Sequence, residues 1–175
     1  MLTGRELQRN EIEHVWQIDR AEVIENVYYV ENGQLVLKPE RWDMTGWPVG
    51  EAAIYTPLLI DCFDRGGWFY GLLEDDRLIG VVVLESKFIG SRLDLLQLKF
   101  MHVSHSYRKQ GLGRKLFDLA TVKARQQGAR GLYISATPSE NTVNFYLRRG
   151  CFPTPNPDPE LLTLEPEDIH LECTL

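Results

Sequence analysis

The most informative part of the chain reads Leu93-Asp-Leu-Leu-Gln-Leu-Lys-Phe-Met-His-Val103, followed by Ser-His-Ser-Tyr-Arg-Lys-Gln-Gly-Leu-Gly-Arg114. The first half is apolar enough to form a buried strand. The second half is a basic turn with two glycines, after which a helical pattern begins. Leu96, Leu98 and Phe100 alternate as the residues of one strand face should. The sequence therefore predicts a strand, a turn and a helix in succession.

This strand contains an irregularity in its alternation. Met101 and Val103 carry the apolar side, one residue out of phase with Phe100. A β-bulge produces such a slip, because one extra residue turns every later side chain to the other face, and it leaves backbone groups free to bind a ligand. A strand buried on both faces is the alternative, since phase then carries no information. The strand alone leaves both interpretations open.

The turn has the features of an anion site. Apolar residues from Leu112 to Ala124 repeat at helical spacing, and Gly128 suits the end of that helix. Gly111 and Gly113 therefore fall at the helix N-terminus, where free N–H groups and the helix dipole favour an anion. The cationic residues around the turn are Arg108, Lys109 and Arg114. We predict a phosphate or pyrophosphate site here.

Two familiar phosphate-binding patterns do not fit this turn. The chain has no Gly-x-x-x-x-Gly-Lys-Ser/Thr run, and a dinucleotide fingerprint would need a glycine at Leu116. The remaining pattern, Arg108-Lys-Gln-Gly-Leu-Gly113, resembles the pyrophosphate-binding turn of the GNAT superfamily of acetyl-CoA-dependent N-acetyltransferases. Val103-Ser-His-Ser-Tyr107 resembles the Val-x-Pro-x-Tyr of that family, with His105 in place of the proline. Phe145-Tyr-Leu-Arg-Arg-Gly-Cys-Phe152 resembles its Phe/Leu-Tyr-x-x-x-Gly-Phe pattern.

The resemblance implies a fold and a coenzyme. The implied fold is α/β (α+β): a mixed, mostly antiparallel central sheet flanked by helices, with a bulged, splayed central strand pair. The implied cosubstrate is acetyl-CoA, without a metal. The residues expected to contact it are Met101, His102, Val103, Arg108, Lys109, Gln110, Gly111, Leu112, Gly113, Arg114, Ser139, Asn141 and Tyr146.

The composition of the chain limits the number of domains and the kinds of partner that we expect. With 175 residues, 43% hydrophobic and 25% charged, we expect one domain with a real core. We divide it into acceptor-side helices and loops (1–67), a coenzyme core (68–152) and a proline-rich loop with a terminal strand (153–175). A net charge of −6 argues against general nucleic-acid binding, and no apolar run is long enough to span a membrane. We expect a cytoplasmic protein whose three cysteines are buried and reduced.

The other elements are predicted from spacing and turn residues. We expect an N-terminal helix capped by Thr3, a second helix over 51–64 interrupted at Pro57, and a hairpin over 68–85. A strand over 131–136 should lie parallel to the strand before the coenzyme turn, because a helix connects them. A helix capped by Thr137 should follow. The end of the chain, from 169 to 175, alternates like a half-exposed strand.

Tyr146 is the candidate acid for the leaving thiolate. In many GNAT members the tyrosine of this pattern faces the sulfur, although its spacing with Val143 also suits an ordinary packed aromatic. The family often has an asparagine seven residues before the tyrosine, where this chain has Ser139. Ser139 or Asn141 is expected to take its place.

The candidate bases are His102 and Glu85. A base must accept the proton of the amine near neutral pH, which requires a histidine or a carboxylate with a shifted pKa. Asp94, Gln97 and His105 lie within range along the chain, and both leading candidates also suit ordinary surface or strand-end positions. Backbone N–H groups near Met101 or Val103 are the expected donors to the thioester oxygen.

The acceptor side is rich in aromatic residues. Tyr28, Tyr29, Trp42 and Trp47, with Glu25, Glu31 and Asp43 nearby, suit a cationic amine, a roof over a core or a homodimer interface equally well. We expect acetyl transfer to a primary amine of a small molecule or a protein, by direct attack in a ternary complex. A non-catalytic acyl-CoA sensor and transfer of a longer acyl group are the alternatives.

Overall fold

The computed structural model describes all residues from 1 to 175. The strands are β1 (Leu2–Glu6), β2 (Glu22–Glu31), β3 (Gln34–Met44), β4 (Trp68–Glu74), β5 (Arg77–Ile89), β6 (Leu95–Val103), β7 (Gly131–Ala136), β8 (Phe152–Pro153) and β9 (Ile169–Thr174). The α-helices are α1 (Glu51–Asp64), α2 (Leu112–Gln126), α3 (Glu140–Leu147) and α4 (Pro159–Leu164), and the 3-10 helices are η1 (Arg9–Gln17) and η2 (His105–Tyr107). None of the helices is long and apolar enough to cross a bilayer.

Seven strands form a mixed sheet in the order β1-β4-β5-β6-β7-β9-β8, and β2 and β3 form a separate ribbon. Neighbours β1–β4, β4–β5, β7–β9 and β8–β9 are antiparallel, whereas β6 and β7 are parallel. The predicted fold class, a mostly antiparallel sheet with helices, is confirmed. The chain forms two compact units, described in turn: residues 1–22, 44–86 and 98–123, and residues 23–43, 87–97 and 124–175.

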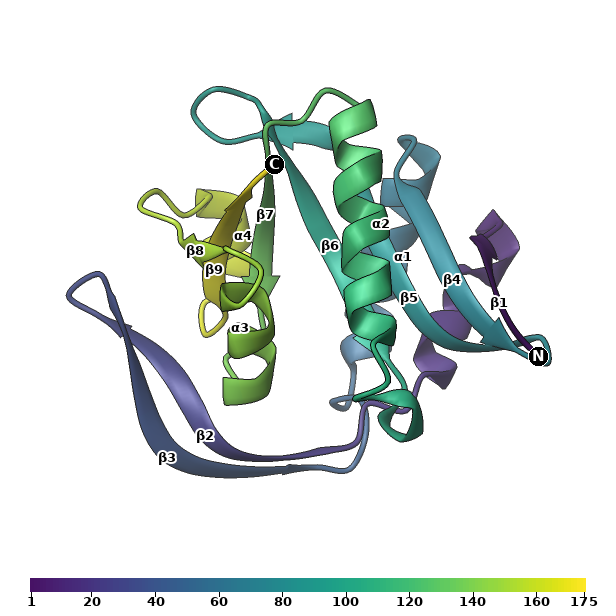
Figure 1. The fold of residues 1–175 in the computed structure, drawn as a ribbon, viewed down its shortest axis with the longest axis horizontal. Coiled ribbons are helices and arrows are strands. Elements are labelled where there is room, and N and C mark those ends of the chain that lie inside the picture. The colour runs from purple at the N-terminus through teal and green to yellow at the C-terminus, as the bar shows by residue number, and fades with distance from the viewer. The chain divides into compact units, whose positions relative to one another are not determined.

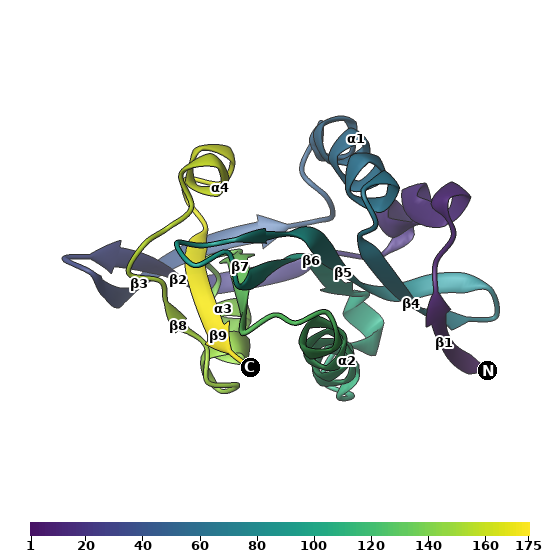
Figure 2. The same ribbon diagram turned by 90° about the horizontal axis from the view of Figure 1, so that it is seen from above.

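In the first unit, helices cover both faces of the sheet. Figure 1 shows α2 lying across β5, and Figure 2 shows α1 and η1 on the opposite face. Leu59 of α1 packs in a buried cluster with Val81 and Val83 of β5. On the other face, Leu116 of α2 lies 3.5 Å from the position that a Cβ atom on Gly80 would occupy. Strand β5 is apolar on both faces because it is covered on both.

In the second unit, β7 lies beside β9 and the first residues of β6 (Figure 1). The parallel pairing joins residues 95–97 to residues 131–133. The ribbon β2–β3 is attached to the start of α3, because Val27 forms a β-bridge with Ser139 and the Tyr28 N–H donates to the Pro138 carbonyl at 2.7 Å. The Tyr28 hydroxyl also donates to Asn144 of α3 at 2.8 Å.

Several predicted elements are confirmed. The hairpin β4–β5, the strands β6 and β7 with their parallel pairing, and the helix α2 all lie where the sequence predicts them. Gly128, after α2, has a φ of 89°, as expected for a glycine that ends a helix. Helix α1 has the predicted bounds, but it runs without a break through Pro57.

Other predictions are wrong. The N-terminus forms strand β1 and the helix η1 rather than one helix capped by Thr3, since β1 pairs along its whole length with residues 70–74 of β4. The cap of α3 is Ser139 rather than Thr137, because the Ser139 hydroxyl accepts the Thr142 N–H. The terminal strand β9 is mostly buried on both faces rather than half-exposed, and long-range packing of this kind is invisible in its alternation.

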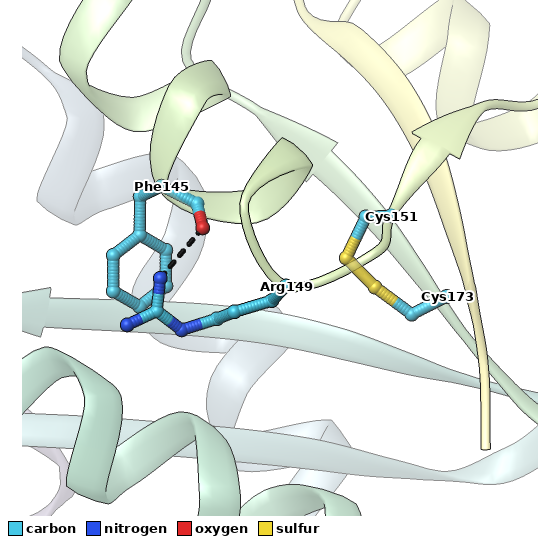
Figure 3. Close-up of a disulfide and its surroundings, with 4 residues drawn as sticks. All are labelled: Phe145, Arg149, Cys151 and Cys173. Atoms are coloured by element: carbon cyan, nitrogen blue, oxygen red, sulfur yellow. Dashed lines mark hydrogen bonds between the residues drawn. A yellow bond between two sulfur atoms is a disulfide. The ribbon is translucent and has the colours of Figure 1, made fainter.

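The cysteine prediction is wrong for two of the three residues. Cys151 and Cys173 form a disulfide, with their Cα atoms 4.2 Å apart (Figure 3). The register of β8 and β9 pairs Phe152 with Glu172, which places the two cysteines opposite each other. Their separation of 22 residues gives no sign of this pairing in the sequence. Cys62 is a buried free thiol, as expected.

Candidate active site

The turn before α2 has a backbone suited to an anion. Lys109 and Gly111 have positive φ angles of 61° and 82°, which reverse the chain between η2 and α2. The first hydrogen bond of the helix runs from the Lys115 N–H to the Gly111 carbonyl at 3.0 Å. The N–H groups of residues 111–114 precede this bond and have no partner within the helix. They therefore lie at the positive end of the helix dipole, ready to bind an anion.

The space around Gly111 fits a phosphate group. A Cβ atom built on Gly111 would meet no heavy atom within 4 Å. A hollow of about 390 Å³ extends from this glycine along α2, lined by Gly111, Arg114, Lys115, Asp118, Leu119 and Val122. Arg114 and Lys115 are exposed at the end of this hollow that lies next to the turn. Their positive charge favours an anion there. The predicted pyrophosphate site is thus open, with Lys115 and Arg114 as its cations and Asp118 at 3.7 Å from Arg114.

Two side chains of the turn hydrogen-bond to nearby backbone carbonyls. The Arg108 guanidinium donates to the carbonyls of Val103, Ala21 and Asp19, at 2.9, 3.0 and 3.2 Å. The Gln110 amide donates to the Ser106 carbonyl at 3.1 Å. These bonds shape the turn, and the coenzyme contacts expected at Arg108 and Gln110 remain predictions.

The end of β6 differs from its start. Residues up to Phe100 include a buried face, whereas Met101, His102 and Val103 are all partly exposed. The next residue, Ser104, stays beside β5, since its N–H donates to the Ile79 carbonyl at 2.8 Å. The alternation of burial therefore ends where the sequence predicts a slip. The bulge itself and its backbone donors remain predictions.

His102 lies among aromatic rings. Its ring centroid is 4.5 Å from that of Phe100 and 4.8 Å from that of Trp47, in edge-on contacts. Burial, and then the positive charges of Arg20 and Arg108, hold the pKa of His102 well below its usual range. The imidazole is therefore neutral near pH 7, with a lower affinity for a proton than an ordinary histidine has.

Beside it lies an ion pair that the sequence did not reveal. Arg20 donates from one nitrogen to both carboxylate oxygens of Glu51, at 3.0 and 3.1 Å, and its guanidinium carbon lies 5.1 Å from the centre of the Trp47 ring. Burial raises the pKa of Glu51, although the charge of Arg20 opposes that shift. No local motif marks Arg20 or Glu51, because the residues that meet here come from segments far apart in the chain.

The carboxylate of Glu85, the second candidate base, already has several hydrogen-bond partners. Arg65 donates to both of its oxygens at 2.7 and 3.1 Å, the Ser86 N–H donates at 2.9 Å, and the Lys99 ammonium lies 3.7 Å away. Burial raises the pKa of Glu85, but these bonds and charges outweigh it and lower the pKa overall. A carboxylate held in this way is a weak proton acceptor at neutral pH. These contacts favour a structural role for Glu85.

Tyr146 lies in the second unit, on α3. Its side chain is 5% exposed and its ring contacts that of Phe145, with the centroids 5.2 Å apart. Burial raises its pKa, opposed by the charge of Arg149, so the phenol stays protonated and can donate. Arg149 itself donates to the Phe145 carbonyl and stacks on the Phe145 ring (Figure 3).

The other predicted coenzyme residues of α3 have different surroundings. Ser139 is buried and its hydroxyl caps the helix, with a further bond to the Thr142 hydroxyl at 2.9 Å. Asn141 is exposed in the first turn of α3. Coenzyme contacts at these two positions remain predictions.

The aromatic residues of the acceptor side separate into two groups. Trp47 meets Trp16, Phe100 and His102 in the first unit. Tyr28, Tyr29 and Trp42 lie on the β2–β3 ribbon of the second unit. On that ribbon, the nearby acidic residues are engaged: Glu25 pairs with Arg41, and Glu31 pairs with Lys38.

Comparisons with known proteins match the fold described above. The acetyltransferase (GNAT) family model matches residues 35–151. A crystal structure of a nourseothricin acetyltransferase has 19% identity and a TM-score of 0.70, over 99% of this chain and 98% of that one. A putative streptothricin acetyltransferase from Bacillus anthracis, in complex with acetyl coenzyme A, has 16% identity and a TM-score of 0.72, over 100% and 99%.

A third similar structure is that of an enzyme named for a protein acceptor. The ribosomal-protein-S18-alanine N-acetyltransferase from Escherichia coli has 14% identity and a TM-score of 0.61, over 99% of this chain and 94% of that one. A search of curated proteins found no match.

Proposed function

Because the chain belongs to the GNAT acetyltransferase family, we propose that it transfers an acetyl group from acetyl-CoA to a primary amine of a small molecule. The observation that carries this proposal is the turn at residues 108–113. It offers unpaired N–H groups, open space at Gly111 and the charges of Arg114 and Lys115. These features suit the pyrophosphate of coenzyme A.

The residues of the chain divide the chemistry between them. The amine nitrogen forms a bond to the acetyl carbon, and the bond from that carbon to sulfur breaks. His102 takes the proton that the amine loses, since its imidazole is neutral. Tyr146, which burial keeps protonated, gives its hydroxyl proton to the departing thiolate. The proton taken up by His102 then returns to the Tyr146 oxygen through solvent, which restores both groups. The N–H groups of Met101 and Val103 are the proposed donors to the thioester oxygen.

We infer the class of acceptor from acetyltransferases that resemble this chain in size and fold. The nourseothricin and streptothricin acetyltransferases match this chain along nearly its whole length, as well as their own. Their names point to small amine-bearing molecules. The S18-alanine enzyme, equally similar in coverage of this chain, makes a protein amine the second candidate.

The test is release of free thiol from acetyl-CoA in the presence of candidate acceptors. We expect release with nourseothricin or another small primary amine, and little with a peptide that carries the S18 N-terminus. Mass spectrometry should show a gain of one acetyl group on the amine. Tight acetyl-CoA binding without acetylation of any amine in a broad panel would favour the non-catalytic sensor.

A further inference from the structure

The indole of Trp47 is in direct contact with the proposed base. Its ring centroid lies 4.8 Å from that of His102, at an interplanar angle of 71°. Phe100 contacts the same imidazole at 4.5 Å and 63°. The Phe100 and Trp47 rings stack on each other at 5.6 Å and 10°. The imidazole therefore lies against two aromatic rings that also pack together.

The indole of Trp47 is itself fixed from several directions. Its N–H donates at 2.9 Å to the carbonyl of the buried Ile18, at the end of η1. Trp16 contacts the indole edge-on at 4.9 Å, and the Arg20 guanidinium carbon lies 5.1 Å from its centre. A ring anchored in this way can fix the position of a neighbouring side chain.

The backbone at Trp47 is also restrained. Pro48 follows it, and a residue before proline is biased toward extended conformations. The Pro48 carbonyl accepts the Glu51 N–H at 3.2 Å, which attaches this short segment to the first turn of α1. The position of the indole is thus set by η1 and α1.

The orientation of His102 matters for the proposed chemistry. A general base works only if a ring nitrogen lies within hydrogen-bond distance of the proton that it takes. A misplacement of about 1 Å can cost about a hundredfold in rate. In a catalytic triad, a carboxylate bound to the imidazole sets its orientation. At His102, the contacts available for this purpose are those with Trp47 and Phe100.

We propose that Trp47 is a positioning residue, which fixes the orientation of the His102 imidazole toward the acceptor amine through direct ring contact. This inference rests on the proposed function, in which His102 is the base. The role differs from binding of a cationic amine, because the Trp47 ring already carries the Arg20 guanidinium. It is also distinct from an effect on basicity, since burial lowers the pKa of His102 and weakens it as a base.

The kinetic test compares Trp47→Leu with Trp16→Leu. The Trp16 ring belongs to the same cluster but meets Trp47 and Phe100 instead of His102. Trp47→Leu should lower kcat per folded molecule by about tenfold to a hundredfold, with little change in the KM for acetyl-CoA. Trp16→Leu should keep most of the original kcat. Trp47→Phe should do so as well, because it retains a ring beside the imidazole.

A second readout, the NMR signal of the His102 ring, needs no acceptor. His102→Asn assigns this signal among the four histidines. Nuclear Overhauser contacts should join the imidazole to the Trp47 indole in the original protein. In Trp47→Leu the titration midpoint of His102 should rise toward about 6.5, because water reaches the ring. A midpoint that rises while kcat falls indicates lost orientation, since a stronger base alone would speed the reaction.

Three results with the variants would each overturn the proposal: an unchanged kcat in folded Trp47→Leu, an unchanged His102 midpoint in that variant, or an equal loss of kcat in Trp16→Leu. Absence of the Overhauser contacts in the original protein would overturn it without any variant. Failure of the proposed function would look different, because the original protein would then acetylate no amine. The NMR comparison would still decide whether Trp47 holds the imidazole.

Discussion

The two terminal nitrogens of Arg65 donate hydrogen bonds to both carboxylate oxygens of Glu85, at 2.7 and 3.1 Å. The carboxylate is 6% exposed, whereas the Arg65 side chain is 40% exposed. Glu85 therefore serves mainly to hold the end of α1 against β5.

Glu85→Gln should lower stability and leave turnover per folded molecule nearly unchanged. Removing the Glu85 charge should cost about 1–3 kcal/mol, because Arg65 loses a buried hydrogen-bond partner but stays 40% exposed and bound to Asp61. Asp61→Asn is the matched control, since Asp61 binds the same arginine at 2.8 Å from an exposed position, and exposed pairs contribute about 1 kcal/mol or less. A loss of a hundredfold or more in kcat, with little change in unfolding free energy, would instead identify Glu85 as the base.

The stabilisation by Glu85 should depend on pH. Its pKa is lower in the folded protein than in the unfolded chain, so the unfolded chain binds more protons and stability rises with pH. The contribution is present above the unfolded value of about 4.3 and is lost as pH falls through the folded pKa. The difference in unfolding free energy between the original protein and Glu85→Gln should therefore shrink between pH 6 and pH 3. A difference independent of pH would contradict this.

Gly111→Asp should abolish coenzyme binding. The new carboxylate would occupy the open space at the turn and repel the pyrophosphate. Gly128→Asp is the matched control, because Gly128 also has a positive φ and open space around it, but lies at the other end of α2. Both variants carry a similar backbone strain of about 1–2 kcal/mol. Equal affinity for coenzyme A in the two would place the site elsewhere.

Tyr146→Phe should lower kcat by about a hundredfold and leave coenzyme affinity unchanged, since general acids contribute roughly that much. Tyr133→Phe is a control in the same unit. Its hydroxyl hydrogen-bonds to the His170 ring at 2.7 Å and accepts the Asp158 N–H, so its loss should reduce stability and leave turnover intact. Unchanged kcat in Tyr146→Phe would assign the proton of the thiolate to another donor.

The Cys151–Cys173 disulfide should make stability depend on the redox state. It closes a loop of 22 residues, which corresponds to about 3 kcal/mol. In a chain of this length, reductant should lower the melting midpoint by roughly 6–12 °C. Cys62→Ser should keep this response, whereas Cys151→Ser should remove it. An unchanged melting midpoint on reduction of the original protein would show that the disulfide does not stabilise the fold.

The strand, turn and helix from 95 to 126 were predictable because their signals are local. Apolar alternation, two glycines and a 3.6-residue repeat lie within about thirty residues. The N-terminal strand β1 was not predictable, since Leu2–Glu6 is exposed and polar and becomes a strand only by pairing with β4. Tertiary pairing can override a local capping pattern such as that of Thr3.

The candidate site divides in the same way. Gly111 and His102 were identifiable, because a motif and a strand position mark them. Arg20 and Glu51 were not, since they lie 31 residues apart in the chain and meet only through their side chains. Likewise, the sequence marks Arg108 as a cation but does not show that each of its three side-chain nitrogens donates to a backbone carbonyl.

Direct titration of acetyl-CoA into the protein tests the central claim, with NAD as the comparison ligand. We predict saturable binding of one acetyl-CoA per chain, weakened by high salt because the turn binds a charged group, and no binding of NAD. Absence of acetyl-CoA binding in the folded protein would contradict the assignment of the turn at Gly111 and, with it, the proposed acetyl transfer.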